Sequence, residues 1–196
     1  MVTKKGKIKK TDLECYSRPR TTGIIAMNLK DNDELVKVLK TNNDKEIMIA
    51  TKKGQAVKFS EKDVRAMGRT ASGVRGIRLS KTDEVISAII AEPGSTIFTI
   101  TENGYGKRTK VEEYRLINRG GKGVRNIICS SRNGSVVDIR RVNDNDELII
   151  MSKQGQAIRL KASQISVIGR NTQGLRIMKL KQGDKITSIA KVVNGD

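Results

Sequence analysis

The chain of 196 residues has no histidine, no tryptophan and only two cysteines, Cys15 and Cys129. Two thiols without histidine cannot supply the four ligands of a zinc site, so that class of metal centre is excluded. General acid–base catalysis would fall to carboxylates or lysines, and the acidic residues cluster in segments that read as turns. We therefore expect no metal, no cofactor and no catalytic activity from this chain by itself.

Long hydrophobic runs are also absent. The longest aliphatic stretch, Val85–Ala91, is too short to cross a bilayer, and the basic N-terminus lacks the apolar segment of a signal peptide. The two cysteines suggest no disulfide framework, which is typical of a reducing compartment. We expect a soluble, cytoplasmic protein that does not engage a membrane.

Aromatic residues make up 3% of the chain. Proteins that bind single-stranded DNA or RNA stack bases on aromatic side chains, and this chain has almost none to offer. A nucleic-acid partner would therefore be a duplex recognised through its backbone, with little reading of bases.

Positive charge is abundant. The 39 lysines and arginines against 21 acids give a net charge of +18, and each quarter of the chain is positive. A charge of this size indicates a polyanionic partner, double-stranded DNA above all, although a merely solubilising surface is the simpler alternative. Because the charge is spread evenly, it does not indicate a disordered basic tail.

Two series of glycines share one period. Gly6, Gly54, Gly104 and Gly155 each end a short polar segment, and a second series follows in step at Gly23, Gly73, Gly123 and Gly174. Two independent series with a spacing near 50 residues indicate four copies of one unit, at about 1–50, 51–100, 101–150 and 151–196.

Each unit reads as β-strands. Residues 46–51 and 55–59 flank Lys52-Lys53-Gly54 as two strands flank a hairpin turn, and the pattern recurs around Asn103-Gly104 and Gln154-Gly155. A short strand follows the second glycine, and a fourth lies at 85–90 after an acidic turn. Four short strands in about 50 residues predict an all-β, propeller-like array of four-stranded blades.

The basic residues near these turns and glycines are the candidate DNA contacts, since a repeated basic loop would form a positive track along the rim. The sharpest of these segments is Arg119-Gly-Gly-Lys-Gly123, in which two cations accompany glycines that let the backbone approach phosphates. It lacks the spacing of a Walker loop, and a solvated glycine turn is the plain alternative. The full predicted set is Lys4, Lys5, Arg18, Arg20, Lys53, Arg69, Arg75, Lys107, Arg108, Arg119, Gly120, Gly121, Lys122, Gly123, Lys153 and Arg170.

Residues 64–79, 103–109, 113–114 and 168–174 resemble the C-terminal domain of the DNA gyrase A protein, and the resemblance covers essentially the whole chain. It implies a β-pinwheel, in which neighbouring blades exchange strands, with a basic perimeter that wraps DNA for negative supercoiling. The signature Gln-Arg-Arg-Gly-Gly-Lys-Gly is matched at five of its seven positions, by Arg119–Gly123, and in the third copy rather than the first.

The resemblance further implies that the chain is the last four blades of a larger gyrase A protein. Its partners would then be duplex DNA, the rest of gyrase A and the gyrase B protein, with the isolated region monomeric. Two alternatives remain at this point: the corresponding domain of topoisomerase IV, and a propeller that binds an acidic protein.

Overall fold

The computed structural model describes residues 1–30 and 32–192; Asp31 of the predicted acidic turn and residues 193–196 of the last predicted unit lie outside them. The described residues form strands and short 3-10 turns, arranged as four antiparallel sheets. The all-β prediction is confirmed.

Three of the sheets have four strands each. The strands of each sheet are named below in their spatial order, from the inner edge of the array to the outer edge. The first contains β3 (Leu35–Lys37), β1 (Val2–Thr3), β2 (Lys7–Ile8) and β6 (Val74–Arg75). The second contains β7 (Val85–Ala91), β4 (Glu46–Thr51), β5 (Gln55–Ser60) and β10 (Val124–Arg125). The third contains β11 (Val136–Val142), β8 (Thr96–Thr101), β9 (Tyr105–Lys110) and β14 (Leu175–Arg176). The fourth has three strands among the described residues, β15 (Ile186–Lys191), β12 (Glu147–Ser152) and β13 (Ala157–Lys161).

Each predicted hairpin is present. β4 pairs with β5 from Glu46↔Ser60 to Ala50↔Ala56, and β8 with β9 from Thr96↔Lys110 to Ile100↔Gly106. The turn glycine between β8 and β9, Gly104, has φ +81°, and a Cβ there would lie 2.3 Å from the Met178 carbonyl oxygen. Only glycine fits that position, which explains why this glycine recurs with the period of the sequence.

A short 3-10 turn follows the second strand of each hairpin. These turns are η1 (Leu13–Tyr16), η2 (Glu61–Asp63), η3 (Val111–Glu113) and η4 (Ala162–Gln164). Each leads the chain away from its own sheet and toward the loop that carries the second glycine of the repeat.

The outer strand of a sheet comes from the next unit along the chain. β6 pairs with β2, β10 with β5, and β14 with β9, as in Val124↔Ala56 and Leu175↔Gly106. Neighbouring sheets are therefore joined by an exchanged strand, as the β-pinwheel resemblance implies. These exchanged strands are only two residues long, shorter than the sequence pattern predicts.

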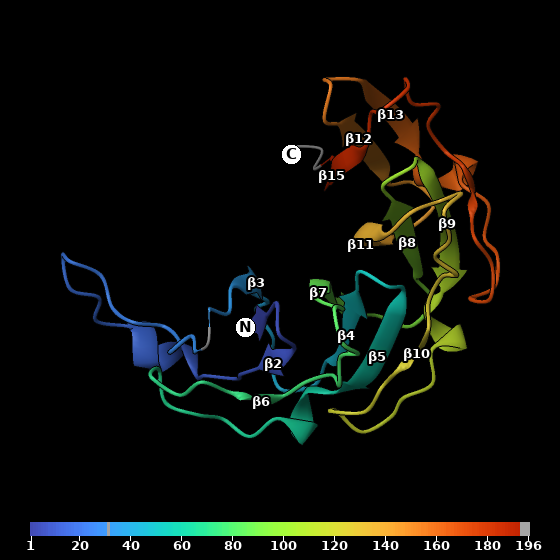
Figure 1. Cartoon of the computed structure of the whole chain (residues 1–196). Helices are drawn as coiled ribbons and strands as arrows, with labels where there is room; N and C mark the ends of the chain where they lie inside the picture. The colour runs from blue at the N-terminus through green and yellow to red at the C-terminus, as the bar shows by residue number, and fades with distance from the viewer. Residues whose placement is uncertain (31, 193–196) are drawn as a thin grey trace.

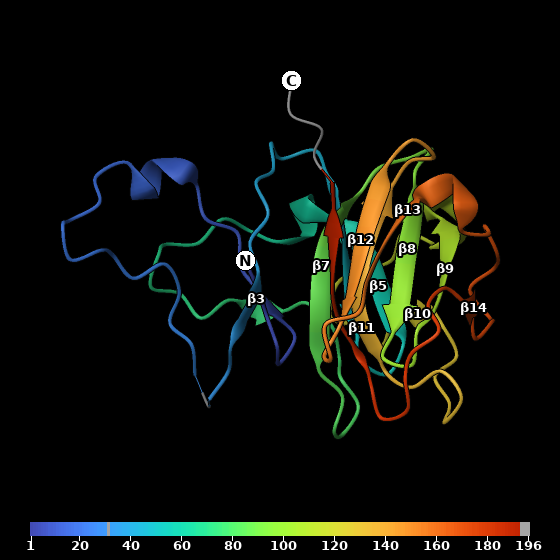
Figure 2. The ribbon, with the colours of Figure 1, turned by 90° about the horizontal axis from the view of Figure 1, so that it is seen from above.

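The four sheets stand side by side in an open arc (Figure 1). The inner strands β3, β7, β11 and β15 contact one another in chain order, while β6, β10 and β14 form the outer edge. Viewed from above, residues 12–30 extend away from the first sheet (Figure 2). No helix in the described part of the chain is long and apolar enough to cross a membrane.

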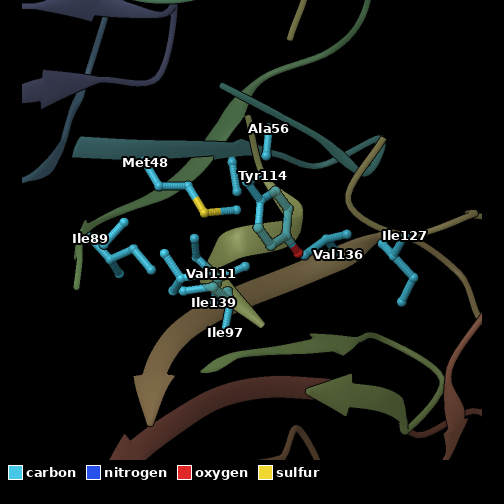
Figure 3. Packing of buried hydrophobic residues seen from close by; sticks show 11 residues of the cluster. Met48, Ala56, Ile89, Ile97, Val111, Tyr114, Ile127, Val136 and Ile139 are labelled. Carbon is cyan, nitrogen blue, oxygen red and sulfur yellow. The ribbon is translucent and has the colours of Figure 1, made fainter. Parts of the chain in front are cut away.

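The hydrophobic core is divided into three clusters, one at each junction between sheets. The cluster between the second and third sheets includes Met48, Ile97, Tyr114 and Ile139, all at most 1% exposed. Figure 3 shows the Tyr114 ring packed among these aliphatic side chains. Its hydroxyl donates a hydrogen bond to Asn126 Oδ1 at 2.5 Å, so the buried polar group is satisfied. Stability therefore arises from contacts between neighbouring units, as in other repeat proteins.

Candidate nucleic-acid interface

The outer edge consists of β6, β10 and β14 together with the loop that precedes each, at 68–73, 118–123 and 169–174. These loops lie directly on the preceding unit. The Gly120 amide donates to the Gly76 carbonyl at 2.6 Å, the Arg78 amide to Gly121 at 2.8 Å, and the Ile128 amide to Thr172 at 2.9 Å. The outer edge is therefore one continuous surface rather than a row of separate tips.

One arginine in each outer strand is exposed to solvent: Arg75 in β6, Arg125 in β10 and Arg176 in β14. Arg75 is among the residues predicted from the sequence, whereas Arg125 and Arg176 are not. The signal that identifies them is the repeat itself, because they follow the second glycines of the third and fourth units as Arg75 follows that of the second. The structure thus extends the predicted track by two cations.

A second arginine in each loop is half-buried and anchored to backbone. Arg69 Nη1 donates to the Ile25 carbonyl at 3.1 Å, Arg119 Nη1 to Arg75 at 3.1 Å, and Arg170 Nη1 to Arg125 at 2.8 Å. The acceptor is in each case the equivalent residue of the preceding unit. These three predicted contacts therefore hold the loops in place, and part of each guanidinium is already committed.

The glycine loop, Arg119–Gly123, combines close packing with exposure. Gly123 has φ +77°, and a Cβ there would lie 2.3 Å from the Ala56 carbonyl oxygen, so glycine is required for β10 to reach β5. The Gly120 amide donates to the Gly76 carbonyl and is therefore not free to donate to a phosphate. Among the described residues the Lys122 side chain has no hydrogen-bond or ion-pair partner, and it is exposed.

Lys107 and Arg108, also predicted as DNA contacts, are buried at 1% and 4% exposure. Lys107 Nζ donates to the carbonyls of Gly169 at 2.6 Å and Arg170 at 2.9 Å, and burial lowers its pKa to about 8. Arg108 donates to the Ile165 carbonyl and pairs with Asp144 at 2.5 Å. Successive side chains of a strand point to opposite faces, and the next unit covers β9 on both: Gly169 and Arg170 accept from Lys107, and Ile165 accepts from Arg108, so neither cation faces solvent.

The predicted lysines of the hairpin turns lie beside the acidic turns. Lys4 Nζ is 3.3 Å from Glu34 Oε1 and 3.7 Å from Glu84 Oε2, and Lys53 Nζ donates to Thr82 Oγ1 at 2.6 Å. The Lys5 amide donates to Asp33, while Lys153 is exposed. The positive field of these turns is partly neutralised by the acids beside them.

Arg18 and Arg20 lie in the segment that extends from the first sheet, and both are exposed. They belong to the unit whose loop is two residues shorter than the others. Within the described part of the chain, neither side chain makes a hydrogen bond or ion pair to the outer edge. Among the same residues, no group of three or more cysteine, aspartate or glutamate side chains could hold a metal ion.

The sequence profile of the family described as "DNA gyrase C-terminal domain, beta-propeller" matches residues 1–42, 45–92, 95–145 and 146–192. The chain belongs to this family. The DNA gyrase A protein of Halalkalibacterium halodurans is 55% identical over 191 residues, which is 97% of this chain and 23% of that protein. The chain thus spans about a quarter of the length of such gyrase A relatives.

Two solved structures share the fold. The structure of the DNA gyrase A C-terminal domain superposes with a TM-score of 0.86 at 28% identity, over 98% of this chain and 64% of that one. The C-terminal domain of DNA topoisomerase IV superposes with a TM-score of 0.92 at 26% identity, over 97% and 60%. Because the fold is common to both, the higher identity to gyrase A sequences is what disfavours topoisomerase IV.

Proposed function

We propose that this chain binds duplex DNA without sequence preference along its outer edge, and bends and wraps the DNA in support of negative supercoiling by a gyrase. The observation that carries the proposal is the series Arg75, Arg125 and Arg176, exposed at one equivalent position in three successive outer strands. A duplex carries closely spaced phosphates along its length, so a row of cations along an arc is the complementary surface. Bending a site of 20–30 bp by 40–90° costs roughly 1–6 kcal/mol, which several phosphate contacts can offset.

In this proposal the chain is a non-catalytic region of a larger cytoplasmic protein, with four repeats and no oligomerisation of its own. It acts together with the rest of gyrase A and with the gyrase B protein. The family membership and the share of the relatives' length that the chain covers support this placement. Lys107 and Arg108 support the surface from beneath and are left out of the DNA path.

The experiment measures duplex affinity against salt concentration. Lys122→Gln with Arg125→Gln removes two exposed cations of the outer edge, and we expect weaker binding and a log–log salt slope smaller by roughly 1–2. The control, Lys40→Gln with Lys191→Gln, removes two exposed cations of the inner edge: Lys40, which follows β3, and Lys191, the last residue of β15, which pairs with Asp146 at 2.7 Å. Equal losses in the two variants would show that net charge, and not the outer edge, binds DNA.

A further inference from the structure

Two hollows on the outer edge occupy equivalent positions in the repeat. The Lys7 pocket, of about 360 Å³, is lined by Lys7, Arg75, Arg78 and Leu79 among others. The Tyr105 pocket, of about 320 Å³, is lined at the same positions by Tyr105, Arg176, Lys179 and Leu180. Each is built from the hairpin of one unit and the exchanged strand of the next, so the strand exchange itself creates the pocket.

Cations surround the Tyr105 pocket. Arg132, Arg176, Lys179 and Lys181 line it and are all exposed, against one acid, Asp184. Asp184 is buried and uses Oδ1 to accept the amides of Gln154 and Lys185. The pocket therefore presents a net positive charge to an incoming anion.

Two of these cations are already oriented. Arg176 Nη2 donates to the Tyr105 hydroxyl at 3.0 Å, and the guanidinium carbons of Arg132 and Arg176 lie 5.0 and 5.5 Å from the centroid of the Tyr105 ring. These contacts restrain both side chains on one buried aromatic ring, and less side-chain entropy remains to be lost when an anion binds. The guanidinium groups of Arg132 and Arg176 hold the pKa of Tyr105 below its usual value, and Arg132 has the larger effect.

The junction between these two pockets is different. At the position of Arg78 and Lys179 the third unit has Ile128, and at the position of Lys7 and Tyr105 the second unit has Gln55. The nearby Lys53 donates to the Lys81 carbonyl and to Thr82. Cationic pockets thus occur at alternate junctions, and the glycine loop lies between them.

We propose that the Tyr105 pocket is a phosphate socket that receives a backbone phosphate of the bound duplex, with the guanidinium groups of Arg132 and Arg176 as its principal donors. Guanidinium groups bind phosphate oxygens through paired N–H donors, and Lys179 and Lys181 add charge at the rim. The inference rests on the proposed function and fixes where along the outer edge a phosphate is held.

The titration of the Tyr105 phenol can report whether the socket is occupied. The chain has three tyrosines and no tryptophan, and burial raises the pKa of Tyr114, so ultraviolet absorbance of tyrosinate follows Tyr105 apart from Tyr114. A phosphate on Arg132 and Arg176 adds negative charge beside the phenol and competes for its donors. We expect inorganic phosphate, and separately a 30-bp duplex, to move the Tyr105 titration to higher pH.

Three variants make the assignment. Tyr105→Phe identifies the reporter band, and Arg176→Gln with Lys179→Gln should abolish the shift. The control, Lys40→Gln with Lys191→Gln, should leave it intact.

A shift with inorganic phosphate but none with duplex overturns the DNA assignment, and no shift with either overturns the socket. If the wild-type chain binds duplex with a steep salt slope but without the shift, the socket is wrong and the proposed function stands; absence of duplex binding refutes the proposed function itself.

Discussion

The loops at two neighbouring junctions are held in different ways. Beneath the glycine loop, Arg119–Gly123, the facing residue of β5 is the apolar Val57, and the loop is held by backbone hydrogen bonds such as Gly120 to Gly76. Beneath the 169–174 loop, the equivalent residue of β9 is Lys107, whose amino group donates to two loop carbonyls. At the position of the exposed Lys122, the second loop has Gln173, which is half-buried and accepts a hydrogen bond from Ser130 Oγ at 3.3 Å.

The difference shows that a cation near a loop can either hold the loop from inside the protein or remain exposed on its surface. Lys107 stabilises its loop from inside and is inaccessible to a partner, whereas the glycine loop uses backbone contacts and keeps its lysine in solvent. Net charge alone does not distinguish the two arrangements, and only the outward cations can contribute to a DNA path.

The largest effect is expected where the glycine loop meets β5. Gly123→Ala places a Cβ 2.3 Å from the Ala56 carbonyl oxygen at a positive φ, and we expect a loss of about 3 kcal/mol in the free energy of unfolding. Gly121→Ala is the matched control, because its nearest neighbour would be 3.8 Å away, and it should cost under about 0.5 kcal/mol. Urea denaturation compares them; equal losses would contradict the requirement for close approach.

The second effect is a pH dependence of the free energy of unfolding that the buried Lys107 causes. Burial holds the pKa of Lys107 at about 8 in the folded chain, below the unfolded value, so the unfolded state binds more protons between pH 8 and about 10. Stability conferred by this group is therefore present at high pH and is lost as pH falls through 8. Wild type should gain about 1–2 kcal/mol relative to Lys107→Met between pH 8 and 10. Parallel stability curves for the two proteins would contradict a buried, pKa-shifted amine.

The smallest effect is local. Lys107→Met removes both hydrogen bonds to Gly169 and Arg170, so the Ile128 amide, which donates to Thr172 in the same loop, should exchange with solvent about fivefold faster. The Arg78 amide donates to Gly121 in the glycine loop and serves as the internal control. Hydrogen exchange followed by NMR measures both; an equal acceleration would mean that Lys107 supports the whole array.

Much of the fold is predictable from the sequence because it depends on local signals. Turn glycines such as Gly54 and Gly104 and the flanking apolar runs specify hairpins, and the period specifies their number. The exchange of β6, β10 and β14 is not a local property, and only the family resemblance predicts it. The two-residue length of these strands depends on how far the glycine loops approach the next sheet, which no pattern encodes.

The candidate site is less predictable. Lys107 and Arg108 follow a turn glycine and look like rim cations, but only the structure shows that the next unit of the chain covers them both. The opposite case is Arg176, which the 50-residue period marks as clearly as it marks Arg75. The pairing of Arg132 with Tyr105 could not be predicted, because it joins two loops whose proximity depends on packing.

The exchanged strands also decide where this chain can be divided. A cut at residue 100, which looks natural from the glycine period, would separate the second sheet from β10, its own outer strand, and leave the carbonyl and amide groups of β5 without their partners. A cut after Arg75, Arg125 or Arg176 keeps the preceding sheet whole but divides the next one; after Arg125, for example, β8 and β9 lose both β11 and β14. The sheets overlap along the chain, so no single cut between the first and last sheets leaves every sheet complete.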